Sequence, residues 1–274
     1  MSRFYEASQK SQKESRETKA PAPETARASV DTGQSVILGV AQSCRLVNFE
    51  IPAESRLVAL TEQSGGGAEK FRVLAARLEK LREAQKSLKF VQITSAVSGE
   101  GKTLVSANLA LTLALKNSKV LLVEGDLRRP HLPGVLGLSQ VPGIADWWSG
   151  ARPDINSLLY QLQEMPLWLL LAGGAHRNPA KILASPRFAK VFAQFSRQFD
   201  WIIVDSPELL DVSSWSKLTD GTLLVVREGV TPMKALRNAL VSVESAKLIG
   251  VVCNDTTEAE LASGSTPDRA QGEL

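Results

Sequence analysis

Residues 93–110, ITSAVSGEGKTLVSANLA, constrain the fold of this chain more than any other segment. A short apolar run ends in a glycine-containing loop, and a long run of helix-forming residues follows at once. In such a strand–loop–helix unit, the backbone N–H groups of the loop converge on one point and the helix adds its positive end. The segment therefore predicts an anion-binding loop of the P-loop type inside an α/β domain.

The chain on either side of this loop alternates apolar runs with segments of helical periodicity. Strands are predicted at 89–95, 119–126, 200–206, 221–228 and 247–255, and helices at 68–85, 103–117, 185–199 and 233–246. The strands are too apolar for either face to meet water, which indicates a mostly parallel sheet flanked by helices on both faces. The expected fold class is α/β with the P-loop NTPase arrangement. Ligands of such sheets bind at the carboxyl ends of the strands.

Composition divides the chain into four parts. Residues 1–35 and 256–274 are rich in polar and small residues, and we expect them to be disordered tails. Residues 36–65 contain short apolar pieces that suit a strand or docking segment, and the glycines at 65–67 are a predicted hinge. Residues 66–255 form the predicted P-loop domain.

Charge and cysteine content exclude several classes of protein. The net charge is +3, and Lys and Arg alternate with acidic residues, so no nucleic-acid partner is expected. Two cysteines and two histidines argue against a disulfide scaffold and a histidine metal cluster. No apolar run approaches the roughly 20 residues that span a bilayer, and the first residues lack the apolar core of a signal peptide. We expect a cytoplasmic protein that reaches the inner face of the membrane only through a partner.

The loop predicts ATP and Mg²⁺ as ligands. Glycines at 99 and 101 allow the backbone to approach phosphate closely, although Ala96 stands where the strict pattern has glycine. Lys102 reaches the β and γ phosphates, and the Thr103 hydroxyl coordinates Mg²⁺. The predicted cofactor-binding residues of this segment are Ser98, Gly99, Glu100, Gly101, Lys102, Thr103 and Leu104.

Acidic residues end two of the predicted strands. VLLVEGDLRRP places Glu124 and Asp126 at one strand end, and WIIVDSPE places Asp205 at another. A single acid in such a place is usually a helix cap or turn residue. Two acidic strand ends beside a P-loop instead suggest carboxylates that hold Mg²⁺ directly or through water. The predicted metal ligands are Thr103, Asp126 and Asp205.

Three motifs in order carry a family resemblance. SAVSGEGKT, VLLVEGDLRRP and WIIVDSPE resemble the Walker A, A′ and B motifs of the bacterial tyrosine kinases, or BY-kinases, which control exopolysaccharide chain length and export. The resemblance covers residues 66–255. It implies an ATP-dependent protein-tyrosine (auto)kinase, activated by a membrane polysaccharide co-polymerase that regulates chain length. A homo-oligomer is a further implied state.

The resemblance also implies roles for individual residues. The catalytic set is Lys102, Glu124, Asp126 and Asp205. Asn254, at the end of the last strand, corresponds to an adenine contact, and Arg128 to a contact with phosphate or with the next subunit. Glu69 and Arg72 match the first two positions of the family's Glu-x-x-Arg-x-x-Arg oligomerisation motif.

The chain departs from the family at several positions. Glu124 replaces the first Asp of the Walker A′ motif, Glu208 a proline, Ser214 an Asp, and Ala75 the last Arg of the oligomerisation motif. The C-terminal tail has no tyrosine, although BY-kinases usually end in a tyrosine cluster that they phosphorylate. The chain has only Tyr5, in the predicted tail, and Tyr160, which is expected to pack or to end a helix.

These departures keep two other functions open. The first is an ATP-binding regulatory subunit with little or no kinase activity that docks on the co-polymerase. The second is a positioning ATPase of the ParA and MinD type. Those proteins carry a signature Lys early in the P-loop, where this chain has Val97, so this alternative ranks lowest.

Overall fold

The structure is a computed structural model that describes residues 45–47, 55–162, 165–209, 215–243 and 247–255. Both predicted tails, Tyr5 and Ser214 lie outside these described residues, as does most of the segment before residue 55.

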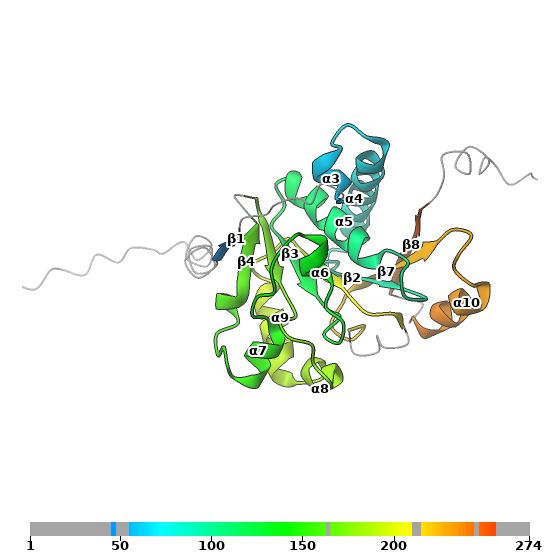
Figure 1. Ribbon diagram of the computed structural model, residues 1–274. Coiled ribbons are helices and arrows are strands. Elements are labelled where there is room, and N and C mark those ends of the chain that lie inside the picture. Colours follow the sequence, from blue (N-terminus) through cyan, green and yellow to red (C-terminus); the bar gives the residue numbers. More distant parts are fainter. Residues whose placement is uncertain (1–44, 48–54, 163–164, 210–214, 244–246, 256–274) are drawn as a thin grey trace, which may run out of the picture. The chain divides into compact units, whose positions relative to one another are not determined.

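The described strands form one eight-stranded sheet in the order β1-β4-β5-β3-β6-β2-β7-β8 (Figure 1). Every neighbouring pair is parallel except β4 and β5, which are antiparallel. The strands are β1 (Arg45–Val47), β2 (Phe90–Ser95), β3 (Val120–Glu124), β4 (Leu159–Leu162), β5 (Leu167–Leu170), β6 (Trp201–Asp205), β7 (Gly221–Arg227) and β8 (Leu248–Asn254). The predicted α/β class with a mostly parallel sheet is confirmed.

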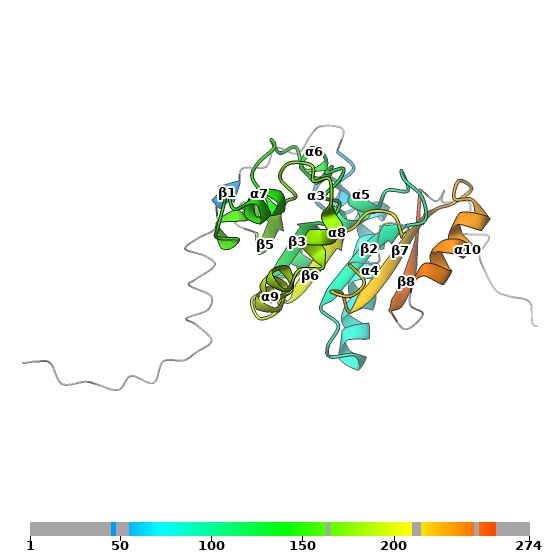
Figure 2. The same cartoon turned by 90° about the horizontal axis from the view of Figure 1, so that it is seen from below.

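Helices cover both faces of this sheet. The helices are α3 (Val58–Thr61), α4 (Gly66–Ala84), α5 (Lys102–Leu115), α6 (Leu132–Val135), α7 (Ile144–Ser149), α8 (Pro179–Leu183), α9 (Pro186–Phe195) and α10 (Met233–Ser242), with a 3-10 turn η1 (Asn156–Leu158). Figure 1 shows α3, α4 and α5 grouped together, apart from α7, α8 and α9. Figure 2 shows α10 beside β8 at the edge of the sheet.

The alternation of side chains along the strands explains this arrangement. Val120 and Leu122 of β3 enter the apolar cluster that contains α5, whereas Leu121 and Val123 enter the cluster that contains α9. Successive side chains of a strand point to opposite faces, so a strand that is apolar throughout needs a covering layer on each side. None of the helices found in the described residues is both long and apolar enough to cross a bilayer.

The structure corrects the sequence-based assignments at several elements. The predicted hinge at 65–67 is wrong, because Gly65 is the N-cap of α4 and the next two glycines form its first turn. In the predicted linker, Arg45–Val47 pairs with β4 and α3 packs against the core that contains α5. β4 and β5 were not predicted at all.

Candidate functional site

The loop between β2 and α5 requires glycine at two positions. Gly99 and Gly101 have φ angles of 84° and 87°, in the left-handed region. At Gly101 space is limiting as well, because an added Cβ would lie 2.1 Å from Asn254 Nδ2. Only glycine combines this backbone conformation with the absence of a side chain.

Glu100 holds the loop in shape from within. Its side chain is 1% exposed and accepts hydrogen bonds from the Val97 N–H, at 2.9 Å, and from the Thr231 hydroxyl. Its backbone carbonyl accepts a hydrogen bond from Asn254 Nδ2 at 2.9 Å. The Glu100 carboxylate is therefore used to build the loop, and a ligand would meet this residue through its backbone N–H.

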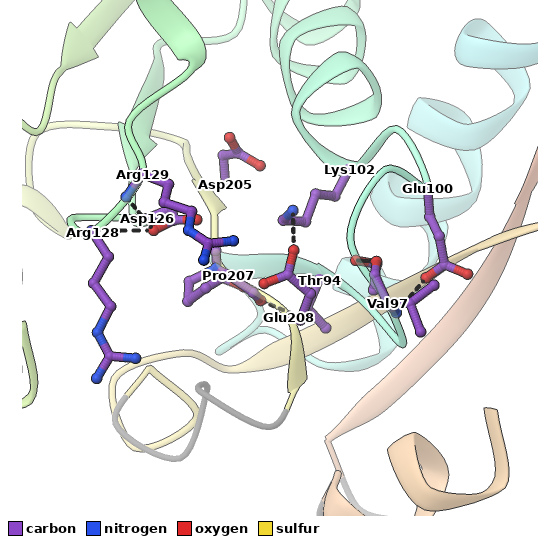
Figure 3. Close-up of polar contacts among 12 residues, drawn as sticks. Thr94, Val97, Glu100, Lys102, Asp126, Arg128, Arg129, Asp205, Pro207 and Glu208 are labelled. Atoms are coloured by element: carbon purple, nitrogen blue, oxygen red, sulfur yellow. Dashed lines mark hydrogen bonds and ion pairs between the residues drawn. The ribbon is translucent and has the colours of Figure 1, made fainter. Parts of the chain in front are cut away.

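Lys102 forms an ion pair with Glu208 (Figure 3). Lys102 Nζ lies 2.9 Å from Glu208 Oε1, and the two side chains are 12% and 24% exposed. Partial burial raises the pKa of Glu208, but hydrogen bonds from Lys102, from its own backbone and from Ser98 outweigh burial and leave the pKa below its usual value. The carboxylate is thus held ionised beside the P-loop lysine.

Asp205 is the last residue of β6 and lies next to the first turns of α5. It is 2% exposed and accepts a hydrogen bond from Ser106 Oγ at 3.3 Å. Burial raises the pKa of Asp205 to about 7, although Thr103, Lys102 and Ser106 favour the charged form. The Walker B carboxylate is thus joined through Ser106 to α5, the helix that follows the Walker A loop.

Glu124 ends β3 opposite Asp205 in the sheet. Its Oε1 accepts the Leu132 N–H at 2.8 Å, and its Oε2 accepts the Ala172 N–H at 2.9 Å. The side chain is 1% exposed, and this burial raises its pKa despite the backbone donors. Both carboxylate oxygens therefore tie together backbone segments next to the site.

Asp126 lies two residues after Glu124, in the turn that leads from β3 to Arg128 and Arg129. Its Oδ1 accepts the backbone N–H groups of Arg128, at 3.1 Å, and Arg129, at 2.9 Å (Figure 3). Gly125 permits this turn, because an added Cβ there would lie 2.8 Å from the Asp205 carbonyl oxygen. Gly125 N donates to the Asp205 carbonyl at 2.7 Å, so the ends of β3 and β6 are joined one residue before Asp126.

The predicted oligomerisation residues lie on α4. Arg72 donates to Glu69 Oε2 from Nε at 2.7 Å and to the Gln63 carbonyl from Nη1 at 2.7 Å, on an exposed surface. Ala75 is fully buried in the core under α4, so a long basic side chain has no room there. A groove of about 630 Å³ is lined by Glu69 together with Leu104 and Asn254 of the predicted nucleotide site.

The structure thus brings most of the predicted site residues to one edge of the sheet. Asp205 ends β6, Asp126 lies two residues after β3, and Lys102 and Thr103 begin α5 after the loop from β2. Asn254 reaches the same loop from the end of β8. Sequence reasoning missed the structural roles of Ser106, Thr231 and Glu208. The sequence could have indicated Ser106, because it lies one helical turn after Lys102 and therefore on the same side of the helix. Nothing in the sequence links Thr231 to a loop 131 residues away.

Tyr160 packs in the core, as one of the two expected placements had it. It lies on β4, is 3% exposed, and its hydroxyl donates to the Pro142 carbonyl at 2.9 Å.

The donor set of the site fits a nucleotide with Mg²⁺. A lysine cation already holds an anionic oxygen at 2.9 Å, and the glycine backbone gives the loop the conformation that phosphate-binding loops need. A hydroxyl and a carboxylate, Thr103 and Asp205, lie together at the helix start. Mg²⁺ in such sites is usually held by one or two carboxylates plus substrate phosphates.

Residues 91–265 match the protein family described as CbiA, the CobQ/CobB/MinD/ParA nucleotide binding domain. The chain belongs to this family. Its relatives include proteins named as tyrosine-protein kinases of bacteria, which confirms the resemblance drawn from the three motifs.

Three of these relatives show how far the similarity extends. The succinoglycan biosynthesis transport protein ExoP of Rhizobium meliloti is 32% identical over 219 residues, which are 74% of this chain and 27% of ExoP. The tyrosine-protein kinase YwqD of Bacillus subtilis is 28% identical over 207 residues, 73% of this chain and 86% of YwqD. The crystal structure of the VpsO kinase domain has a TM-score of 0.62 and 28% identity, and covers 69% of this chain and 96% of that domain. The chain spans just over a quarter of ExoP but most of YwqD.

Proposed function

We propose that this chain is an ATP-dependent protein-tyrosine kinase that regulates exopolysaccharide chain length and export. The observation that carries the proposal is the junction of the P-loop and β6 at the start of α5, where Lys102 and Thr103 lie in the first helical turn. There Ser106 Oγ contacts both the Lys102 carbonyl, at 2.8 Å, and the buried Asp205 carboxylate, at 3.3 Å. Relatives named as tyrosine-protein kinases support the acceptor class, and ExoP supports the link to polysaccharide export.

The residues of the site divide the work of phosphoryl transfer. The backbone of residues 98–104 binds phosphate, and Lys102 offsets the charge on the β and γ groups. Thr103, Asp126 and Asp205 would hold Mg²⁺, which neutralises phosphate charge when it is bound. Leu104 and Asn254 line the groove beside the loop and suit the nucleoside end of ATP.

Two further side chains have more indirect roles. The resemblance implies a catalytic role for Glu124, but its two backbone hydrogen bonds favour a positioning role. The bond to Leu132 closes the segment that carries Asp126, so Glu124 orders that carboxylate. Arg128 is proposed to contact phosphate or a neighbouring subunit.

The phosphate acceptor is proposed to be Tyr5 or a tyrosine of another protein. Tyr160 is buried within the sheet and already hydrogen-bonded, so its phosphorylation would require the core to open. A phosphate carries close to two negative charges and three strong acceptors, which no buried strand position tolerates without partners.

The proposed activator is a separate membrane polysaccharide co-polymerase that brings the chain to the inner face of the membrane. Glu69 and Arg72 are proposed to support a homo-oligomer, because they form an exposed charged pair on α4 beside the groove that reaches Asn254.

A second candidate is an ATP-binding regulatory subunit with little or no kinase activity. The Lys102–Glu208 ion pair favours it, because a carboxylate opposes phosphate at the residue on which transfer depends. A positioning ATPase of the ParA and MinD type is the third candidate, and Val97 in place of the signature Lys argues against it.

Incubation of the purified chain with ATP and Mg²⁺, followed by intact-mass analysis and phosphopeptide mapping, tests the proposal. A tyrosine-containing polymer is included as an external acceptor. The kinase proposal predicts phosphotyrosine on Tyr5 or on the polymer, and no phosphate in Lys102→Met. ATP binding without any phosphate transfer would instead support the regulatory subunit.

A further inference from the structure

Hydrogen bonds and packing of the residues on either side of Glu208 fix its position in the fold. Ser206 N donates to the Ile93 carbonyl at 3.0 Å, and Thr94 Oγ1 donates to the Pro207 carbonyl at 2.7 Å, so the backbone before Glu208 is pinned to β2. Leu209, directly after it, is 6% exposed in the core beneath α10. The direction of the Glu208 side chain is therefore set by the fold, and Figure 3 shows it pointing at Lys102.

The carboxylate of Glu208 uses the same donors that a phosphate group would use. It accepts a hydrogen bond from Lys102 Nζ at 2.9 Å, and the Ser98 side chain also favours the charged form. Both residues belong to the predicted phosphate-binding segment. An ionised carboxylate and a phosphate oxygen thus compete for the same lysine.

We propose that Glu208 sets the preference of this site between nucleoside diphosphates and triphosphates by occupying the γ-phosphate side of Lys102. This inference rests on the proposed nucleotide function of the loop. A P-loop lysine contacts both the β and the γ phosphate. A diphosphate leaves the γ side open, so Glu208 remains on Lys102. A triphosphate places a second anion beside the carboxylate and must displace it, because like charges a few ångströms apart repel strongly in a partly desolvated site.

The direct test is the ratio of affinities for ADP and a non-hydrolysable ATP analogue, each with Mg²⁺, measured by calorimetry on the full chain. Glu208→Gln keeps the size and one acceptor oxygen but removes the charge. It is expected to tighten binding of the triphosphate by about tenfold, equal to about 1.4 kcal/mol. Binding of ADP is expected to change by less than about threefold, since the carboxylate and the β-phosphate coexist on Lys102.

Glu83→Gln is the matched control. Glu83 is exposed on α4 and loses the same charge, so both affinities should stay at the wild-type values. Glu208→Ala, which removes charge and reach together, is expected to shift the ratio in the same direction as Glu208→Gln. Thermal unfolding of each variant reports whether the fold persists.

An unchanged ratio in folded Glu208→Gln would overturn the proposal, and so would an equal gain for both nucleotides, because that result indicates a general charge effect. Failure of the underlying function has a different signature. In that case the folded wild type and both Glu208 variants would bind neither nucleotide.

Discussion

At the carboxyl end of β6, Asp205 is almost fully buried, yet the Ser106 hydroxyl donates a hydrogen bond to it. The Thr103 and Ser106 hydroxyls favour its charged form, while burial disfavours that form more strongly and raises its pKa to about 7. A site proposed to hold Mg²⁺ keeps such a carboxylate at a cost to stability. Asp205 therefore predicts a specific dependence of stability on pH.

Asp205→Asn should make the nucleotide-free protein more stable than the wild type, and increasingly so as pH rises. The unfolded carboxyl loses its proton near pH 3.8, whereas the folded one keeps it until about pH 7. Between these values the folded state binds more protons, so raising the pH lowers the free energy of unfolding, and the effect levels off above pH 7. The gap between variant and wild type should widen by about 1.4 kcal/mol per pH unit in this window. Urea unfolding at pH 5, 6, 7 and 8 measures the gap, and parallel curves would contradict the assignment.

At the scale of elements, the loop and β8 depend on each other through Gly101 and Asn254. The Asn254 side chain donates to the Glu100 carbonyl and fills the space where a Cβ at residue 101 would lie. The end of an edge strand thus supports the phosphate-binding loop, and substitution of this glycine should disturb both.

Gly101→Ala should destabilise the protein more than Gly99→Ala does. Both glycines have φ near 85°, so each alanine carries a strain of about 1–2 kcal/mol. Only at residue 101 does the new methyl group also collide with Asn254, since nothing lies within 4 Å of the corresponding position at Gly99. Urea unfolding without nucleotide compares the two variants. Equal losses of stability would show that Asn254 moves aside freely.

The long apolar strands and helices could be predicted because their periodicity is local. β2, β3, β6, β7 and β8 all lie within predicted strands. β5 was not predicted because a short apolar run such as Leu167–Leu170 does not distinguish strand from helix. β4 was not predicted because its four residues, LYQL, are too few to show a period. β1 has three residues and exists through its pairing with β4, a contact more than 110 residues away in sequence.

The same limit applies to the candidate site. The motifs located Lys102, Thr103, Asp126 and Asp205 because loop and strand-end positions are set by local sequence. The other features of the site depend on contacts between segments that are far apart in the sequence. Glu208 lies 106 residues from Lys102, and its ion pair could not be inferred from the replacement of a proline alone.

At the scale of the whole molecule, α4 presents the Glu69–Arg72 pair next to the groove that ends at Asn254. Replacing both residues by alanine should change the free energy of unfolding by less than about 1 kcal/mol, because exposed ion pairs contribute little to stability. The same variant should lose the self-association that the homo-oligomer proposal expects with ATP and Mg²⁺.

Light scattering after size-exclusion chromatography measures this association. The control replaces Glu83 and Lys86, two exposed charged residues at the far end of α4 and just after it, and should associate like the wild type. Association of the Glu69/Arg72 variant at the wild-type level would rule out α4 as the contact. A wild type that is monomeric with nucleotide would contradict the homo-oligomer itself.

The central claim is that Lys102 anchors a nucleotide in the loop between β2 and α5. Calorimetric titration of ATP with Mg²⁺ into the wild type, Lys102→Met and the surface control Lys86→Met tests it most directly. Loss of the lysine cation should weaken ATP binding by at least about tenfold, equal to about 1.4 kcal/mol, while Lys86→Met binds as the wild type does. Wild-type affinity in a folded Lys102→Met protein would contradict the account.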